Sequence, residues 1–425
     1  MSDASRWNAL SRRLGPRASL LEQVGLAAAD CNVRAAVVGG AVRDFLIGRE
    51  VGDLDIVVEG DATEVGRELR HRHGGDLVQH APFMTATWMT PLGSVDLSSA
   101  RRESYACPGA LPEVVHAELT EDLARRDFTI NTLAILVDAS DRGRLVDPHD
   151  GVSDLESGLI RVLHPESFRD DPTRVWRACR YAGRFDFELT SSTAALVEKL
   201  WLEEGMHTIS LQRVANELDK VFLEERVVPV LSRLLQYKVL QSIDVACTLD
   251  SGMMQRVVNG AARYPEWNSA TQEAFWLLLA RGLGRHQRAV LVDLASGKQG
   301  RTGRWLHGPE NLARAEETLG EVQDYARWGA YFSKRAPVEF LVLHALNDAW
   351  HPALHWWMDT GRHLKTAVTA EAMLARDVPQ GPLIGQGLAA AQGLAWQGES
   401  EAEQWRVALM PTISTSAKRP KEGYE

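Results

Sequence analysis

The period of the hydrophobic pattern changes near Glu166, and this change constrains the possible folds most strongly. Before it, short apolar or β-branched runs alternate with helical stretches at 41–47 and 62–72. The expected strands are 35–38, 54–58, 77–78, 84–89 and 95–97. After it, apolar residues recur at helical spacing, with helices expected at 173–185, 192–202, 211–222 and 227–235. The pattern predicts a head with a mixed sheet and helices, followed by an all-helical remainder.

Composition narrows the class of protein. The chain has 425 residues, enough for several cores, and its net charge of −10 excludes a general nucleic-acid coat while allowing a local arginine patch. Without a long apolar run or a signal peptide, we expect a cytoplasmic protein that does not enter a membrane. The four cysteines form no Cys-x-x-Cys pair, so we predict reduced thiols and no structural zinc.

A glycine turn and two aspartates form the first candidate site. Gly39 and Gly40 separate a predicted strand from a helix, which frees the backbone to approach phosphate groups. Asp53 and Asp55 are two apart on an extended segment, so both carboxylates face one side. Such a pair repels itself unless a cation lies between, and Mg²⁺ suits an all-oxygen site. Asp96, on another β-like segment, is a candidate third carboxylate; the alternative for the pair is a solvated strand start.

Further motifs follow in order along the chain. GGAVRD at 39–44 and GDLDIVV at 52–58 precede RRDFTIN at 125–131, DPHDG at 147–151 and DDPTR at 170–174. This order resembles class II tRNA nucleotidyltransferases, the CCA-adding family, together with bacterial poly(A) polymerases. The resemblance covers about 35–225, with Asp170 and Gln212 standing where the family commonly has Glu.

The resemblance implies an α+β fold class: a polymerase-β-type nucleotidyltransferase head with a mixed sheet and helices, then an all-α neck, body and tail. The implied divisions are an N-terminal helical extension (1–33), the head (34–163), a neck that recognises the base (164–235), a body and tail that bind tRNA (236–410) and a flexible tail (411–425).

Specific residues carry the implied activity. Asp53 and Asp55 would bind two Mg²⁺ ions, with Asp53, Asp55 and Asp96 as the catalytic set. The implied nucleotide-binding residues are Gly39, Gly40, Arg43, Asp44, Arg125, Arg126, Asp127, Asn131, Asp171, Arg174, Arg177 and Arg180. Asp171 and Arg174 would read the base edge, because residues three apart share a helix face. The alternative is a simple salt bridge, and for the arginines at 177 and 180 a solvated face.

The implied function is template-independent addition of C, A or both, from CTP and ATP, to the 3′ end of tRNA. The segment 100–115 corresponds to the family's flexible loop but departs from the common CCA-adding pattern, so CCA, CC and A addition all stay open. Poly(A) polymerase is the nearest alternative and a non-catalytic tRNA-binding module a distant one. The sequence leaves the oligomeric state open.

Overall fold

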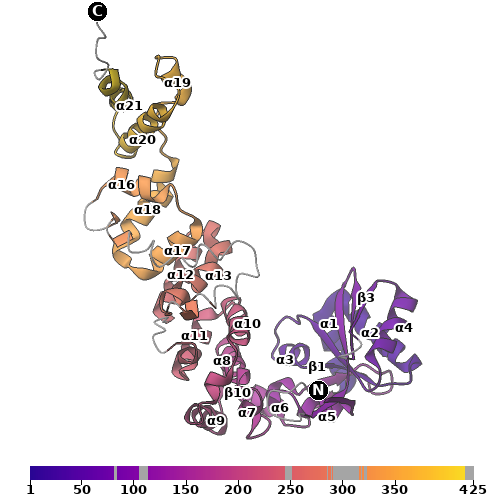
Figure 1. Ribbon diagram of the computed structural model, residues 1–425. Helices are drawn as coiled ribbons and strands as arrows, with labels where there is room; N and C mark the ends of the chain where they lie inside the picture. The colour runs from indigo at the N-terminus through magenta and orange to yellow at the C-terminus, as the bar shows by residue number, and fades with distance from the viewer. Residues whose placement is uncertain are drawn as a thin grey trace, which may run out of the picture. The chain divides into compact units, whose positions relative to one another are not determined.

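The chain was analysed as a computed structural model. It describes residues 1–80, 84–104, 113–244, 251–284, 286–288, 290, 315–316, 318–319 and 323–416. The chain divides into two compact units, one formed by 1–217 with 224–242 and the other by 218–223 with 243–425. Figure 1 shows the strands of the large sheet in the N-terminal part of the first unit and helices through the second.

The head contains nearly all strands. Its elements are α1 (Asp3–Leu14), η1 (Gly15–Arg17), α2 (Ala18–Asp30), β1 (Ala35–Val38), α3 (Gly40–Leu46), β2 (Leu54–Val58), α4 (Ala62–His73), β3 (Asp76–His80), β4 (Thr85–Thr90), β5 (Gly93–Ser99), β6 (Arg101–Ser104), β7 (Glu113–His116), α5 (Leu119–Ala124), η3 (Thr129–Asn131), β8 (Ala134–Leu136), β9 (Leu145–Val146), α6 (Gly151–Glu156) and β10 (Leu159–Ile160). The predicted strands at 35–38 and 54–58 are confirmed as β1 and β2.

Seven strands form one mixed sheet in the order β3-β4-β5-β2-β1-β8-β9. Only β2 and β5 pair in parallel; every other pair is antiparallel. Helices cover both faces. Leu119 and Leu123 of α5 pack with Val38 and Val57 on one face, and α2 and α4 contact strands of the sheet as well. On the opposite face, a Cβ at Gly66 of α4 would lie 3.0 Å from Leu77.

The segment expected to be a flexible loop, 100–115, begins and ends in regular structure. Arg101–Ser104 and Glu113–His116 pair as the antiparallel strands β6 and β7, and residues 105–112 lie outside the described residues. The start and end of this segment are therefore held together as a two-stranded ribbon beside the head.

The helices that follow the head complete the first unit. They are α7 (Ser167–Asp170), α8 (Thr173–Phe185), α9 (Ser191–Leu202), η4 (Gly205–Thr208), α10 (Leu211–Phe222), α11 (Val227–Gln236) and η5 (Val239–Ser242), with the short strand β11 (Glu188–Leu189). The end of α10, from residue 218 onward, belongs to the second unit. Helix α8 matches the predicted 173–185, and α11 packs closely along it. A Cβ on Gly183 would lie 2.3 Å from the Cα atom of Val230, so glycine permits this approach.

The described residues of the second unit are helical, as expected. They form α12 (Ser251–Arg263), η6 (Pro265–Ala270), α13 (Thr271–Arg281), α16 (Tyr325–Phe332), α17 (Pro337–Leu346), η7 (Asp348–Trp350), α18 (His351–Asp359), η8 (Gly361–His363), α19 (Ala370–Leu374), α20 (Pro382–Trp396) and α21 (Glu401–Ser416). Tryptophans fill much of this core, as the sequence predicts: Trp267 and Trp276 are fully buried.

Three smaller expectations concern membrane-spanning helices, the thiols and the C-terminal tail. Among the described residues, no helix has the length and apolar character required to cross a bilayer. Cys31 and Cys179 are free thiols, whereas Cys107 and Cys247 lie outside the described residues. The tail expected to be flexible overlaps the end of α21, which continues to Ser416, and residues 417–425 are again outside the described range.

Candidate functional site

Two aspartates meet on neighbouring strands of the head sheet. Asp55 of β2 and Asp96 of β5 are direct partners in the parallel register. Side chains alternate along a strand, so Asp55 and Val57 lie on the same face of the sheet. Helix α5 covers this face at Val57, which lies farther along β2. Both aspartates are exposed at the uncovered end of this face. The side chain of Thr87 on β4 donates a 2.6 Å hydrogen bond to Oδ1 of Asp96 and so orients that carboxylate.

The acidic group has the electrostatics of a cation site. Burial and then the neighbouring carboxylates of Asp96 and Asp53 raise the pKa of Asp55, whereas Arg126 lowers it. Asp53 is exposed and directly precedes β2. The three carboxylates offer oxygen donors close to one another, an arrangement that fits a hard divalent cation such as Mg²⁺.

Two arginines form the opposite, basic side of the same site. Arg125 and Arg126 follow α5, and the buried carboxylate of Asp122 holds both. Oδ1 of Asp122 accepts from Nη2 of Arg125 at 2.6 Å, and Oδ2 accepts from Nη2 of Arg126 at 3.0 Å. Sequence analysis missed Asp122, although a carboxylate three and four residues before two arginines is a recognisable helical spacing.

The acidic and basic groups line one pocket of about 500 Å³. Its lining residues are Val38, Asp55, Thr85, Ala86, Thr87, Asp96, Leu97, Ser98, Arg125 and Arg126. The structure therefore brings Asp55, Asp96, Arg125 and Arg126 together. Among the described residues, the other predicted nucleotide-binding residues are not part of this lining.

The glycine turn touches the basic side. Gly39 has φ 65°, a left-handed conformation that favours glycine, and a Cβ there would lie 2.8 Å from Nη1 of Arg126. Gly40 begins α3, which is only seven residues long. The turn thus gives the Arg126 guanidinium room beside the end of β1.

A chain of hydrogen bonds connects the glycine motif with α8. Arg43 of α3 is buried and donates to Oδ1 of Asn131 at 2.7 Å, and it also pairs with the adjacent Asp44 at 2.9 Å. Nδ2 of Asn131 donates to Oδ1 of Asp127 at 2.9 Å. The other oxygen of Asp127 accepts from Nε of Arg177 at 2.8 Å. The network holds three motifs, far apart in sequence, in one rigid arrangement.

Charge balance maintains this network. Burial opposes ionisation of Asp127, but Arg177 and the hydrogen bonds from Asn131 and the backbone prevail and lower its pKa. The guanidinium of Arg43 also lies over the rings of Tyr181 and Phe185, 5.1 and 4.6 Å from their centroids. The structure places these polar groups in contact with one another beneath the site.

Asp171 and Arg174, the predicted base-reading pair, do not share one helix as expected: Asp171 is an extended residue after α7, whereas Arg174 lies in the first turn of α8. Their side chains have separate partners. Oδ1 of Asp171 accepts from Nη2 of Arg213 at 2.7 Å. Nη1 of Arg174 donates to the hydroxyl of Ser167 at 2.7 Å, and its Nη2 to the carbonyl oxygen of Arg125 at 3.3 Å. Arg174 thereby connects α8 to the backbone of the basic motif. Arg213 was also missed, since 42 residues separate it from Asp171 and no local spacing indicates the contact.

The arginines farther along α8 lie away from the pocket. Arg180 is 8% exposed and pairs with Glu224 at 3.0 Å. Arg184 donates to the other oxygen of Glu224 at 2.8 Å. The structure brings Arg177 to Asp127 and Arg180 to Glu224, and places neither in the lining of the head pocket.

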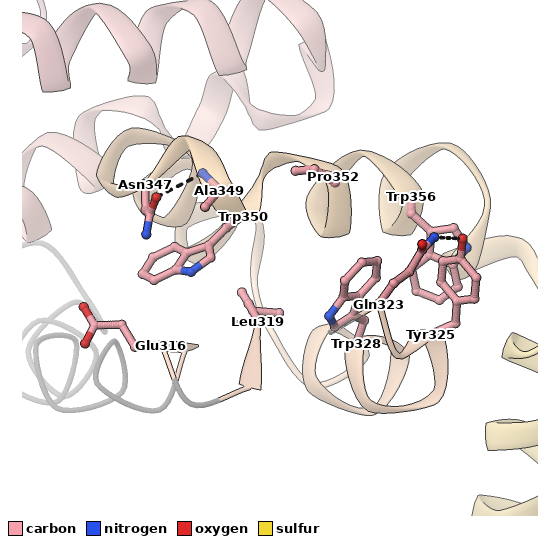
Figure 2. Close-up of a pocket in the computed structure, with 10 residues that line it drawn as sticks. All are labelled: Glu316, Leu319, Gln323, Tyr325, Trp328, Asn347, Ala349, Trp350, Pro352 and Trp356. Carbon is pink, nitrogen blue, oxygen red and sulfur yellow. Dashed lines mark hydrogen bonds between the residues drawn. The ribbon is translucent and has the colours of Figure 1, made fainter. Parts of the chain in front are cut away.

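A second pocket, of about 690 Å³, lies in the helical unit. Figure 2 shows Tyr325, Trp328 and Trp356 gathered at one end of it and Trp350 at the other. Tyr325 stacks on Trp356 with ring centroids 4.8 Å apart, so these rings pack on each other. Among the described residues of its lining, Glu316 alone is charged, so this pocket does not resemble the acidic and basic head pocket.

Comparisons with known proteins agree with this geometry. The sequence model of the poly A polymerase head domain matches residues 35–161. The A-adding tRNA nucleotidyltransferase of Halalkalibacterium halodurans is 43% identical over 370 residues, 86% of this chain and 85% of that protein. The CC-adding tRNA nucleotidyltransferase of Deinococcus radiodurans is 40% identical over 185 residues, 43% of this chain and 46% of that protein.

A solved structure extends the likeness to the whole fold. The Thermotoga maritima CCA-adding enzyme, complexed with tRNA, superimposes with a TM-score of 0.80 and 25% identity, covering 95% of this chain and 98% of that one. The family model and the relatives identify the chain as a nucleotidyltransferase. The chain belongs to the class II tRNA nucleotidyltransferase family, as its motifs predict.

Proposed function

We propose that this nucleotidyltransferase completes the 3′ end of tRNA, acts in the cytoplasm and adds the terminal A. The observation that carries the proposal is the head pocket, where the register of β2 and β5 sets Asp55 beside Asp96 and α5 presents Arg125 and Arg126. One side of the pocket suits a 3′-hydroxyl and cations, and the other suits a triphosphate.

The acidic side would hold Mg²⁺ through Asp53 and Asp55, with Asp96 as a further ligand. Bound there, Mg²⁺ supplies Lewis-acid activation of the attacking hydroxyl and charge stabilisation of the leaving pyrophosphate. Burial, together with repulsion from Asp96 and Asp53, raises the pKa of Asp55, and this supports the assignment because a cation relieves the repulsion. Thr87 positions Asp96 by its hydrogen bond.

The basic side would bind the triphosphate. Guanidinium groups match phosphate oxygens in a bidentate manner. Asp122 holds both arginines in position, while the side chains of Arg125 and Arg126 stay 27% and 21% exposed. The buried network of Arg43, Asn131 and Asp127 would act on the nucleotide by holding the glycine turn and the basic motif in place.

Base selection would lie at the start of α8. Asp171 is half-buried, and its Oδ1 is engaged by Arg213 and Thr173. The proposed role is that Asp171 accepts from the exocyclic amino group of the incoming base, while Arg174 donates to an adjacent acceptor. The bond from Arg174 to the carbonyl of Arg125 would couple base reading to the phosphate-binding side.

Terminal A addition is favoured over CC addition by the extent of the likeness. The A-adding relative aligns along most of both chains, whereas the CC-adding relative aligns over less than half of each. The departure of segment 100–115 from the common CCA-adding pattern supports a restricted product.

The test uses purified protein, Mg²⁺ and labelled ATP or CTP with four acceptors: tRNA lacking CCA, tRNA ending in C, tRNA ending in CC, and an unrelated RNA. We expect one AMP on the CC-ending tRNA and no CMP on any acceptor. CMP incorporation would refute A-only addition, and long A tails on unrelated RNA would instead indicate poly(A) polymerase. An Asp53→Ala/Asp55→Ala variant gives the background.

A further inference from the structure

Three histidines of the helical unit converge at a place that nucleotide addition does not explain. His344 lies in the last turn of α17, and His351 and His355 lie one turn apart on α18. Their ring centroids are 4.0 Å apart for 344 and 351, 5.6 Å for 351 and 355, and 6.2 Å for 344 and 355. One ligating nitrogen from each ring lies within 4.8 Å of the other two.

Backbone carbonyls orient two of the rings. Nδ1 of His344 lies 3.1 Å from the carbonyl oxygen of Arg256, and Nε2 of His351 lies 2.9 Å from the carbonyl oxygen of His344. Because a carbonyl oxygen only accepts, each of these nitrogens donates its proton, and the other nitrogen of each ring keeps a lone pair. This arrangement, an imidazole held by an outer hydrogen bond, is typical of metal-ligating histidines.

The third ring leaves a polar atom without a partner. Among the described residues, nothing hydrogen-bonds the buried Nε2 of His355. Buried polar atoms are nearly always hydrogen-bonded, so an exception calls for an explanation such as a bound ion. Gly260 of α12 makes room for the cluster, since a Cβ there would lie 3.2 Å from Nδ1 of His344.

We propose that His344, His351 and His355 bind one divalent transition-metal ion, with zinc as the preferred occupant, and that the ion clamps α17 to α18. Three imidazole nitrogens without a thiolate suit Zn²⁺, as well as Cu²⁺ and Ni²⁺. Zinc–nitrogen bonds of about 2.0–2.1 Å set tetrahedral donors roughly 3.4 Å apart, so the rings must tilt out of their stack and close by about 1 Å.

The carboxylate of Asp348 favours a cation at this place, and the three histidines leave a fourth ligand position open. Oδ1 of Asp348 lies 3.6 Å from Nε2 of His351 on a side chain that is 75% exposed. Nε2 of His351 is the nitrogen that donates to the carbonyl oxygen of His344, so Asp348 adds negative charge at the outer edge of that ring, and a water molecule can complete the four ligands. The opposing charge is that of Arg256, 4.0 Å from the same carboxylate.

The expectation of no zinc site rested on the cysteines and on an apparent lack of His-x-x-x-His spacing, but this spacing is present in the sequence. His351 and His355 have the His-x-x-x-His spacing that places two rings on one helix face. The third ligand comes from another helix, seven residues earlier. The adjacent face of α18 carries Pro352 and Trp356 of the aromatic pocket (Figure 2), so the clamp would also steady one wall of that pocket.

The test is zinc titration of metal-stripped full-length protein by calorimetry, in excess Mg²⁺ to occupy the carboxylates of the head. We expect one zinc ion per chain. The His351→Ala/His355→Ala variant should bind at least about 100-fold more weakly, because even an outer partner of a metal ligand contributes about 10–100-fold. The matched control is His71→Ala/His73→Ala, which removes two exposed histidines of α4 and should bind like the parent.

Two further measurements separate metal binding from folding and from catalysis. Co²⁺ added to the parent should give the visible absorption bands of a tetrahedral imidazole site. The His351→Ala/His355→Ala variant should still add nucleotides with Mg²⁺, which shows that it folds. A parent that binds no zinc, or equal zinc affinity in the parent and this variant, would overturn the proposal. Neither readout depends on which nucleotide the enzyme adds.

Discussion

Asp122→Asn is the sharpest test of how the basic side of the pocket is built. Asp122 is fully buried, and its two oxygens accept from Arg125 at 3.0 and 2.6 Å and from Arg126 at 3.0 Å. Asparagine keeps the size but not the charge. One oxygen can still accept from Arg125, whereas the new amide nitrogen turns a donor toward the donor of Arg126.

The magnitude follows from these contacts. A hydrogen bond to a charged group contributes about 1.5–3 kcal/mol, and a buried unsatisfied donor costs about 1–3 kcal/mol. The arginines are about a quarter exposed and can regain water, so we expect a net loss of about 3 kcal/mol. For a unit of this size that corresponds to a Tm lower by roughly 6–12 °C. Because Asp122 no longer holds the two guanidinium groups in position, KM for ATP should rise about tenfold, or about 1.4 kcal/mol, while kcat falls less.

Calorimetric melting and steady-state AMP addition to a CC-ending tRNA measure the two effects. Glu121→Gln is the matched control, since it neutralises the adjacent carboxylate, which pairs with the largely exposed Arg102. It should change Tm by no more than about 1 °C, in line with the small value of surface ion pairs. If Asp122→Asn matched this control in both Tm and KM, the proposed positioning of the arginines by Asp122 would be refuted.

Four other predictions follow from the same site. Asp53→Ala/Asp55→Ala should lower the addition rate by roughly three decades or more with the melting curve unchanged; near-normal turnover would exclude them as metal ligands. Asp171→Ala should weaken the rejection of UTP and GTP by roughly ten- to hundredfold, while the control Asp170→Ala should keep the parent's selectivity. If Asp171→Ala were as selective as the parent, Asp171 would have only a structural role. A plot of the logarithm of tRNA affinity against the logarithm of salt concentration should fall with a slope of about one per phosphate contact, and a flat plot would show that the arginine patch does not bind tRNA phosphates. Asp127→Asn should lose most stability at neutral pH. The parent's advantage is complete above the unfolded pKa of about 3.9 and disappears as pH falls through the lower folded pKa, so a constant difference across pH would contradict it.

The elements that sequence analysis predicted well depend on local periodicity. Strand β2 (Leu54–Val58) and helix α8 (Thr173–Phe185) have the predicted bounds, because alternation and helical spacing are properties of a few consecutive residues. The shared face predicted for Asp53 and Asp55 rests on the same local rule and stays a prediction, because Asp53 precedes β2 and does not lie within it. Contacts such as Arg213 with Asp171 did not follow, because they join segments whose pairing no local pattern records.

The order of the motifs was thus enough to determine the family, the mixed-sheet head and the helical remainder. Only the tertiary structure set Asp55 beside Asp96, because the parallel register of β2 and β5 depends on packing across the whole sheet. The tertiary structure likewise formed the hydrogen bond between Arg43 and Asn131, which are 88 residues apart, and placed His344 beside the histidine pair of α18. The physical reason is that propensity and side-chain alternation act within a turn or a strand, whereas register, helix packing and charge pairing are decided when distant surfaces are buried together.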